Sequence, residues 1–257
     1  MHRYWVGPLI LLPLCAALTA HADPVAQTAS GLPPQIIPSV PEVGVIIMQI
    51  PGSSTPPGTG STVPGTGSSG GGTPSASGSG SAYDEMMATP YGAQAAQDAS
   101  AAGINVDAMA AIGMAESNFQ NVPTANGSSS ATGPWQMTTG TFMQYSNANN
   151  LGYTPADITN PADNAQAASY AMAAYANTVS QTTGAPATVL QTYGAWVLGP
   201  GPGSAISIAD ASAPLSDYVS AQSLANNNMT GWTVGQFYSA MSARLGSAAN
   251  ETVLQTT

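Results

Sequence analysis

Glu116 is the residue whose type and setting are best suited to chemistry. It shares one face of an expected helix with Met109, Ile112 and Gly113, because the four lie at positions i, i+3, i+4 and i+7. A glutamate is rarely buried on such an apolar face unless it has a partner or a role. We expect it to lack a counter-charge, and a desolvated carboxyl without one has its pKa raised. The carboxyl would then be a general acid near neutral pH. The alternative is that Glu116 lies on a frayed last turn and points into water.

The scarcity of other reactive side chains excludes several kinds of site. The chain has 12 Asp+Glu but only 2 Lys+Arg and 2 His. The histidines, the single cysteine and Arg3 all fall within residues 1–22, so removal of this segment leaves Arg244 as the one cation and takes the formal net charge from −10 to −11. A Cys or His nucleophile, a Ser-His-Asp triad, a His/Cys zinc site and a disulfide are then excluded. Without lysines, the counterion release that drives nucleic-acid binding is also missing. We therefore expect no metal, no cofactor and no nucleic-acid partner.

Residues 1–22 have the features of a secretory signal peptide. A short positive start precedes a mostly apolar run over 6–18, and small residues occupy the cleavage positions. The run is shorter than the ~20 apolar residues that cross a membrane, and no later stretch is long enough. The lipoprotein alternative requires a small residue before Cys15, but Leu14 stands there. We expect an exported protein, periplasmic or extracellular, without a membrane span.

The rest of the chain divides into a tail, a linker and one domain. Residues 23–50 carry short apolar segments, which could dock a cell-envelope or secretion-apparatus partner or form an apolar patch in an irregular tail. In 51–82, 29 of 32 residues are Gly, Ser, Thr or Pro, a composition that buries too little apolar surface to fold and predicts a flexible linker. The 175 residues of 83–257 are enough for one domain with a core.

The elements that must position Glu116 are expected to be helices, since no convincing alternating strand occurs in this half. The cap and periodicity signals predict helices at five places: after Thr89-Pro90 over 93–102, from Asp107 through Glu116, from Asn160-Pro161, after Pro186, and after Thr233. The domain is therefore predicted to be mostly α.

Three motifs follow Glu116-Ser117 in a recognisable order. They are residues 131–137 (ATGPWQM), 160–164 (NPADN) and 195–201 (AWVLGPG). Together they resemble the lytic transglycosylases of the soluble-lytic-transglycosylase and goose-type lysozyme group, which have a helix ending in Glu-Ser, a Gly-x-x-Gln segment, an Asn-bearing helix start and an Ala-Tyr-Asn-Ala-Gly segment. The resemblance covers about residues 90–205 and implies a lysozyme-like helical fold.

The resemblance also implies an activity on peptidoglycan. The family cleaves the β-1,4 bond between N-acetylmuramic acid and N-acetylglucosamine and leaves a 1,6-anhydromuramic end, without metal or cofactor. By resemblance Glu116 is the sole catalytic acid/base, and Ser117 orients its carboxylate. Trp196 stands where the family usually has a tyrosine, and Tyr193, one turn earlier, could supply the hydroxyl instead. The substrate-binding residues so implied are Gln136, Trp135, Met137, Trp196 and Asn164.

Two of these assignments have alternatives. Trp135 and Trp196 could each be core residues, although Trp135 is the better candidate for stacking on a sugar, because it lies in an expected loop. The loop over 120–154, expected to form much of the wall facing Glu116, contains no Asp or Glu.

Two other functions compete with the transglycosylase reading. A muramidase hydrolase would pair Glu116 with Asp107, Asp157 or Asp163, but Asp107 and Asp163 stand where helix caps are expected. A non-catalytic wall-binding or secretion-scaffold module would only hold glycan while the tail docks a partner.

Overall fold

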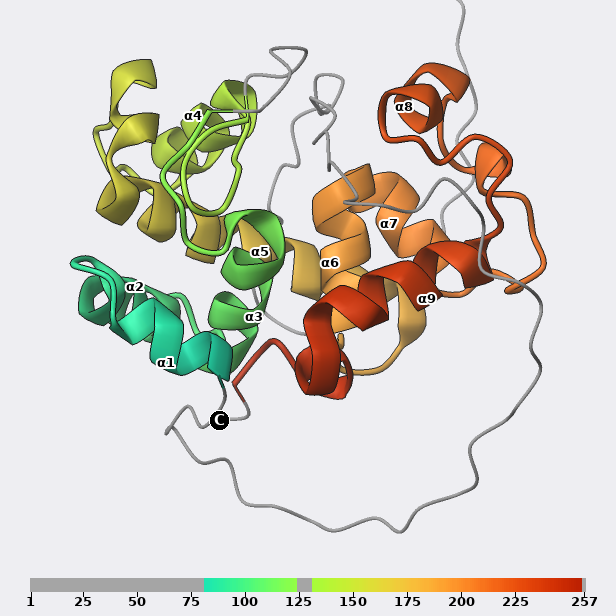
Figure 1. Cartoon of the computed structure of the whole chain (residues 1–257), viewed down its shortest axis with the longest axis horizontal. Helices are drawn as coiled ribbons and strands as arrows, with labels where there is room; N and C mark the ends of the chain where they lie inside the picture. The colour runs from blue at the N-terminus through green and yellow to red at the C-terminus, as the bar shows by residue number, and fades with distance from the viewer. Residues whose placement is uncertain (1–80, 124–130, 256–257) are drawn as a thin grey trace, which may run out of the picture. The chain divides into compact units, whose positions relative to one another are not determined.

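The computed structural model describes residues 81–123 and 131–255. The predicted signal peptide, the tail and residues 51–80 of the predicted linker lie outside the described residues. Every regular element within the described ranges is a helix, and β-pairing there is limited to isolated bridges, so the mostly-α prediction is confirmed. None of these helices has both the length and the apolar character needed to cross a bilayer. The elements, shown in Figure 1, are α1 (Ser81–Met87), α2 (Gly92–Ala101), α3 (Val106–Ser117), α4 (Thr139–Ala148), η1 (Pro155–Thr159), α5 (Pro161–Thr183), α6 (Val189–Leu198), α7 (Pro200–Ile206), η2 (Leu215–Asp217), α8 (Ala221–Asn226), α9 (Val234–Leu245) and η3 (Gly246–Asn250).

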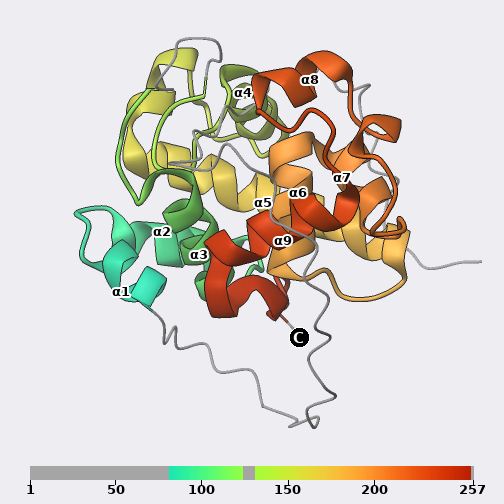
Figure 2. The same ribbon diagram turned by 45° about the vertical axis from the view of Figure 1, so that its right-hand side comes forward.

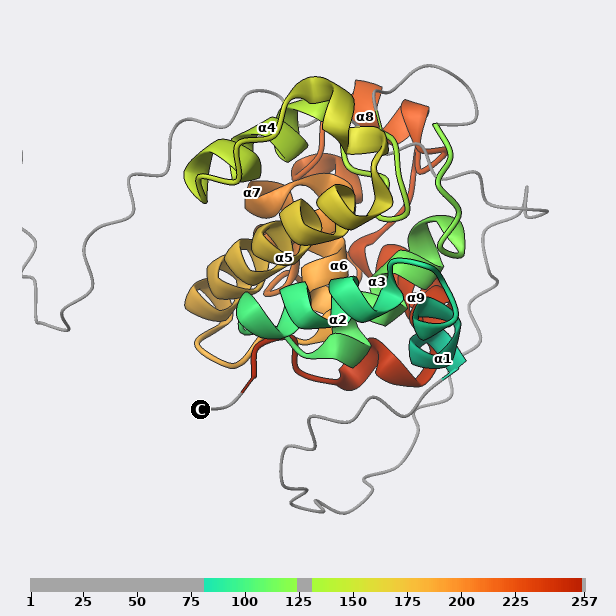
Figure 3. The same cartoon turned by 90° about the vertical axis from the view of Figure 1, so that its left-hand side faces the viewer.

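α5 is the longest helix and the one with neighbours on most sides. Its start agrees with the prediction, because the Asn160 side chain accepts a hydrogen bond from the backbone N–H of Ala162 and Pro161 takes the first helical position. Gly184, at φ 69°, ends it in the left-handed conformation. Five of its 23 residues are fully buried alanines, whose small side chains let neighbouring helices approach closely. α2, α4, α6 and α7 pack against α5 (Figure 3).

α6 packs against α5, α7 and α9 (Figure 2). Thr188 and Gln191 form a capping box at its start, and the helix begins at Val189, after Pro186 as predicted. All residues of α6 are buried except Leu190 and Gln191. α7 approaches so closely that a Cβ on Gly203 would lie 2.2 Å from the Cα of an α6 residue, Ala195, so this contact requires glycine.

α3 carries Glu116 in its last turn. The helix is capped by the side chain of Asn105, which accepts a hydrogen bond from the backbone N–H of Asp107 at 3.0 Å. Asp107 is thus not the cap that was predicted but lies inside the first turn. Asn118, at φ 54°, ends the helix. α1, α2, α6 and α9 all pack against α3, so the helix that carries Glu116 is held by four neighbouring helices.

The C-terminal residues 251–255 join the starts of α3 and α6. The backbone N–H of Asn105 donates to the carbonyl oxygen of Val253 at 2.7 Å, and the N–H of Val189 donates to that of Glu251 at 2.8 Å. The Val253 side chain is fully buried. This segment therefore fixes the first turn of α3 relative to that of α6.

Several boundaries differ from the sequence prediction. α1 begins at Ser81, two residues before the predicted start of the domain. α2 begins at Gly92, because the Thr89 hydroxyl donates to the carbonyl oxygen of Met86 and closes the turn after α1 instead of capping the next helix. α4 lies inside the segment that was predicted to be a loop, and α7 and α8 were not predicted.

Candidate active site

The carboxyl group of Glu116 is buried although part of the side chain is exposed. Both carboxylate oxygens are inaccessible, and neither makes a hydrogen bond of ordinary length and angle. Burial is the main cause that raises the pKa of Glu116 from 4.5 to about 8, against smaller lowering effects of Tyr193 and Arg244. Glu116 is therefore largely protonated at neutral pH and has a proton to give. This agrees with the prediction from the apolar face of α3.

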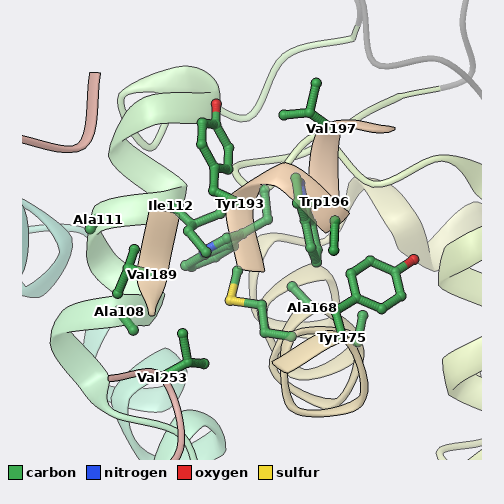
Figure 4. Packing of buried hydrophobic residues seen from close by; sticks show 14 of the residues in the cluster. Ala108, Ala111, Ile112, Ala168, Tyr175, Val189, Tyr193, Trp196, Val197 and Val253 are labelled. Carbon is green, nitrogen blue, oxygen red and sulfur yellow. The ribbon is translucent and has the colours of Figure 1, made fainter. Parts of the chain in front are cut away.

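Tyr193 places a hydroxyl next to this carboxyl group. It lies on α6 with no exposed surface, and Figure 4 shows its hydroxyl pointing away from Ala108 and Val253, toward the C-terminal end of α3. Burial, and then the charge of Glu116, raise the pKa of Tyr193 well above its usual value. The phenol thus stays protonated and can donate toward Glu116. The hydroxyl is near enough to lower the pKa of Glu116, but outside the geometry of a full hydrogen bond.

Arg244 is a charged residue that the sequence analysis did not place beside Glu116. It lies in the last turn of α9. The positive charge of its guanidinium lowers the pKa of Glu116 and that of Tyr193, against the larger raising effect of burial on each. The expectation that Glu116 lacks a counter-charge is therefore wrong. The available signal was that Arg244 is the one Lys or Arg beyond residue 22.

Ser117 holds the end of α3 and does not bond the carboxylate. Its hydroxyl donates to the carbonyl oxygen of Pro134 at 2.6 Å, while the Glu116 oxygens have no full hydrogen bond. The implied role of orienting the carboxylate directly is not what the contacts show. Ser117 instead anchors the turn that carries Glu116 to segment 131–137.

Trp135 is a core residue with no exposed surface. Its indole N–H donates to the carbonyl oxygen of Met109 at 3.0 Å, and its ring meets the edges of Tyr91 and Phe119 with centroids 6.1 Å and 6.2 Å away. A Cβ on Gly113 would lie 2.8 Å from the indole nitrogen, so the ring fits against α3 only because residue 113 is glycine. The prediction that Trp135 stacks on a sugar is wrong for this structure, because the ring faces no surface.

Asn164 and Met137 are also too buried to touch substrate. Asn164 has no exposed surface and Met137 has 1%. The Asn164 side chain accepts from the backbone N–H of Trp135 and donates to the carbonyl oxygens of Thr132 and Ile158. The expected substrate-binding roles are thus replaced by structural ones, since these contacts hold segment 131–137 against α5.

The amide of Gln136 is similarly engaged within the protein. Its nitrogen donates to the carbonyl oxygens of Val122 at 2.9 Å and Gly133 at 2.8 Å, which uses both N–H groups. The residue is 8% exposed and has a positive φ of 44°. Gln136 thus holds the loop beside Ser117 in place through these two hydrogen bonds. Its amide N–H groups are therefore not available to bind a glycan, contrary to the expectation.

Trp196 is 4% exposed, and its indole nitrogen is buried without a hydrogen-bond partner. Its ring meets that of Tyr175 edge-on at 5.9 Å. The structure thus places Trp196 within the core of α5 and α6, with a free N–H as its one unused polar group.

The three aspartates considered as second carboxylates lie elsewhere. Asp107 and Glu116 are at opposite ends of α3, roughly 13 Å apart along the axis at 1.5 Å per residue. Asp157 caps η1 through Thr154. Asp163 lies in the first turn of α5 and interacts with Tyr153. None of them contributes to the pKa of Glu116. Within 81–123 and 131–255, no three His, Cys, Asp or Glu side chains come together as a metal site.

Comparison with known proteins finds a family match in the middle of the chain. Residues 94–205 match the model of the family described as Transglycosylase SLT domain, which confirms the resemblance over this segment. Among solved structures, an inactive mutant of the lytic transglycosylase Slt from Pseudomonas aeruginosa is similar, with 16% identity and a TM-score of 0.40 over 65% of this chain and 27% of that chain. This chain thus spans about a quarter of that protein. No curated protein matches the chain.

Proposed function

We propose, from the match of residues 94–205 to the model of the family described as Transglycosylase SLT domain, that this protein is a peptidoglycan lytic transglycosylase. It cleaves the β-1,4 bond between N-acetylmuramic acid and N-acetylglucosamine and leaves a 1,6-anhydromuramic end. Glu116 is its single acid and base. Action on the cell wall agrees with the export predicted from residues 1–22.

The observation that carries this proposal is the protonated, buried carboxyl group of Glu116. Its pKa of about 8 lets it hold a proton at neutral pH and take one back after donating it. Glycosidases with a second carboxylate place it ~5–5.5 Å away for retention and ~6.5–9.5 Å for inversion. In the part of the chain that the structure describes, no other carboxylate is near enough to change the pKa of Glu116. This favours a mechanism in which the substrate supplies the second nucleophile.

The reaction then needs two proton transfers at one carboxyl group. Glu116 gives its proton to the glycosidic oxygen as the bond from that oxygen to C1 of the muramic sugar breaks, and the substrate acetamido group can assist at C1. The C6 hydroxyl of the same sugar then attacks C1 and returns its proton to Glu116. One C–O bond is exchanged for another, no water is consumed, and the enzyme ends in its starting state. While the Glu116 carboxylate is charged, the Tyr193 hydroxyl donates toward it.

Digestion of purified peptidoglycan tests the proposal, with muropeptides identified by mass spectrometry. Wild-type protein is expected to release anhydromuramic ends, and Glu116→Gln to release none. Glu85→Gln, the same change at an exposed position on α1, is the matched control and is expected to behave as wild type. Full activity of Glu116→Gln would contradict the assignment of Glu116. Reducing muramic ends would indicate a hydrolase. Glycan binding without any cleavage by wild type would indicate a binding module.

A further inference from the structure

We propose that Tyr91 is a positioning residue for Glu116, because its hydroxyl holds the strained turn that follows Glu116 through the carbonyl oxygen of Phe119. This inference rests on the proposed function of Glu116 as the acid. It adds a residue from the connection between α1 and α2, which precedes the segment that matches the family.

The turn after Glu116 has a backbone conformation that residues other than glycine rarely adopt. Asn118 and Phe119 follow each other with positive φ angles of 54° and 58°. Asparagine tolerates this conformation, but for a bulky side chain such as that of phenylalanine it is strained. A strained turn persists only where surrounding contacts hold it, so the contacts of Phe119 determine how α3 ends.

The side chain of Phe119 makes the first of these contacts. The residue is 7% exposed, and its ring meets the edge of Trp135 with centroids 6.2 Å apart. A Cβ on Gly113 would lie 2.7 Å from Cε1 of Phe119, so the ring lies directly on α3, three residues before Glu116. The chain therefore folds back onto the helix that carries the acid.

The hydroxyl of Tyr91 makes the second contact. It donates a hydrogen bond to the carbonyl oxygen of Phe119 across 2.6 Å, and the direction is certain because a carbonyl oxygen only accepts. Burial raises the pKa of Tyr91 from its usual 10.0, so the phenol keeps its proton at neutral pH. The ring of Tyr91 packs edge-on against Trp135 with centroids 6.1 Å apart, which directs the hydroxyl at the turn.

Backbone hydrogen bonds connect this turn to the residues around Glu116. The N–H of Asn118 donates to the carbonyl oxygen of Met114 at 3.0 Å, and that of Gln120 to the carbonyl oxygen of Ser117 at 3.2 Å. With Phe119 held between these bonds, the last turn of α3 stays closed and the carboxyl oxygens of Glu116 stay inaccessible. A loosened turn would displace the acid from the glycosidic oxygen, and small displacements of a catalytic group cost rate. It would also admit water to the carboxyl group.

A simpler role for Tyr91 is to stabilise the fold by joining the α1–α2 connection to α3, and Tyr153 offers the control that separates the two. The Tyr153 hydroxyl donates to Oε1 of Gln166 on α5, and its ring stacks on Phe142 of α4 with centroids 5.6 Å apart. Tyr153→Phe therefore also removes one phenol hydrogen bond and keeps the ring, but these contacts lie on α4 and α5 instead of α3.

The test uses the full chain with Tyr91→Phe and Tyr153→Phe, each in the wild-type and Glu116→Gln backgrounds. The first measurement is the free energy of unfolding between pH 4 and pH 10, compared within each pair that differs only at residue 116. The pH at which this difference levels off reports the pKa of Glu116 and requires no activity. Tyr91 is not among the groups that act on this pKa, so a shift reports a change in the surroundings of the carboxyl group. Tyr91→Phe is expected to lower the levelling-off pH by about one unit, because water reaches the carboxyl group, and Tyr153→Phe to leave it unchanged.

The second measurement is the steady-state kinetics of glycan cleavage. Tyr91→Phe is expected to lower kcat about tenfold and to leave KM nearly unchanged, whereas Tyr153→Phe is expected to keep the wild-type kcat. If Tyr91→Phe only lowers stability, with the titration of Glu116 and kcat as in Tyr153→Phe, the role of Tyr91 is purely structural and the inference is overturned. If the titration shifts but Glu116→Gln keeps full activity, Tyr91 positions Glu116 as inferred and the proposed catalytic role of Glu116 fails.

Discussion

The hydroxyl of Ser117 donates a hydrogen bond to the carbonyl oxygen of Pro134 across 2.6 Å. This bond joins the residue after Glu116 to the segment that carries Trp135 and Gln136. The two segments that the sequence motifs identify are thereby tied together, and the last turn of α3 is held in place by a bond to segment 131–137 and not by a bond to the carboxyl group of Glu116.

Ser117→Ala is expected to lower kcat several-fold and to cost about 1 kcal/mol in the free energy of unfolding, because the carbonyl oxygen of Pro134 loses its donor and the last turn of α3 loosens. Chemical denaturation and steady-state kinetics measure the two effects. Ser100→Ala removes a comparable hydroxyl bond on the exposed side of α2 and should leave kcat unchanged. Equal losses of kcat in both variants would contradict the role of Ser117.

Trp135→Ala is expected to cost ~3–5 kcal/mol in stability, because it empties a core position. The more discriminating variant is Trp135→Phe, which keeps much of the apolar volume but removes the indole N–H bonded to Met109. We expect this variant to be less stable but to have an unchanged KM for glycan strands. A KM raised tenfold with little loss of stability would mean that the ring contacts sugar after all.

Particular helices show what the sequence could predict. Asn160-Pro161 and Thr233 are the observed starts of α5 and α9, because caps act within one turn and are visible locally. α4 was missed, since the run from Thr139 to Ala148 is rich in Thr, Ser, Asn and Gly and buries few apolar residues. Its place depends on packing against α5, which local spacing does not encode.

The candidate site was predictable in part, because some of its properties depend on local sequence and others on packing between distant segments. The position of Glu116 on an apolar helix face correctly indicated a raised pKa, because desolvation follows from its neighbours on α3. The burial of Trp135 was not predictable, since it depends on Asn164 and Gly113 from other segments. The closeness of the Arg244 charge to Glu116 was not predictable either, because it depends on how α9 packs against α3.

The stability of the fold should depend on pH through Glu116. Its pKa rises from 4.5 to about 8 on folding, so between these values the native state holds a proton that the unfolded chain has lost. The free energy of unfolding therefore falls as pH rises through this window, by on the order of 1 kcal/mol per pH unit. Thermal or urea unfolding of wild type and Glu116→Gln from pH 4 to 9 measures this.

In that comparison, the free energy of unfolding of Glu116→Gln should be close to that of wild type at pH 4 and higher than that of wild type at pH 8. Glu85→Gln, at an exposed position, should follow wild type throughout. A Glu116→Gln variant that is less stable than wild type by the same amount at every pH would show that the carboxyl group is structural.

The aspartates near the ends of α5 and η1 should be dispensable for catalysis. Asp163→Asn and Asp157→Asn are each expected to keep kcat within about threefold of wild type, because neither carboxylate acts on Glu116. Asp157→Asn should slightly weaken the capping box with Thr154. Loss of cleavage in a folded Asp163→Asn protein would support a second catalytic carboxylate and the hydrolase reading.

The fate of solvent oxygen tests the lone-carboxylate mechanism most directly. Peptidoglycan is digested by the wild-type protein in water enriched in heavy oxygen, and the muropeptides are weighed by mass spectrometry. If the C6 hydroxyl is the nucleophile, every new muramic end is an anhydro end, one water lighter than a reducing end and without label. If water attacks with the help of a second carboxylate, the new ends are reducing and carry the heavy oxygen, which would contradict the single acid/base role of Glu116.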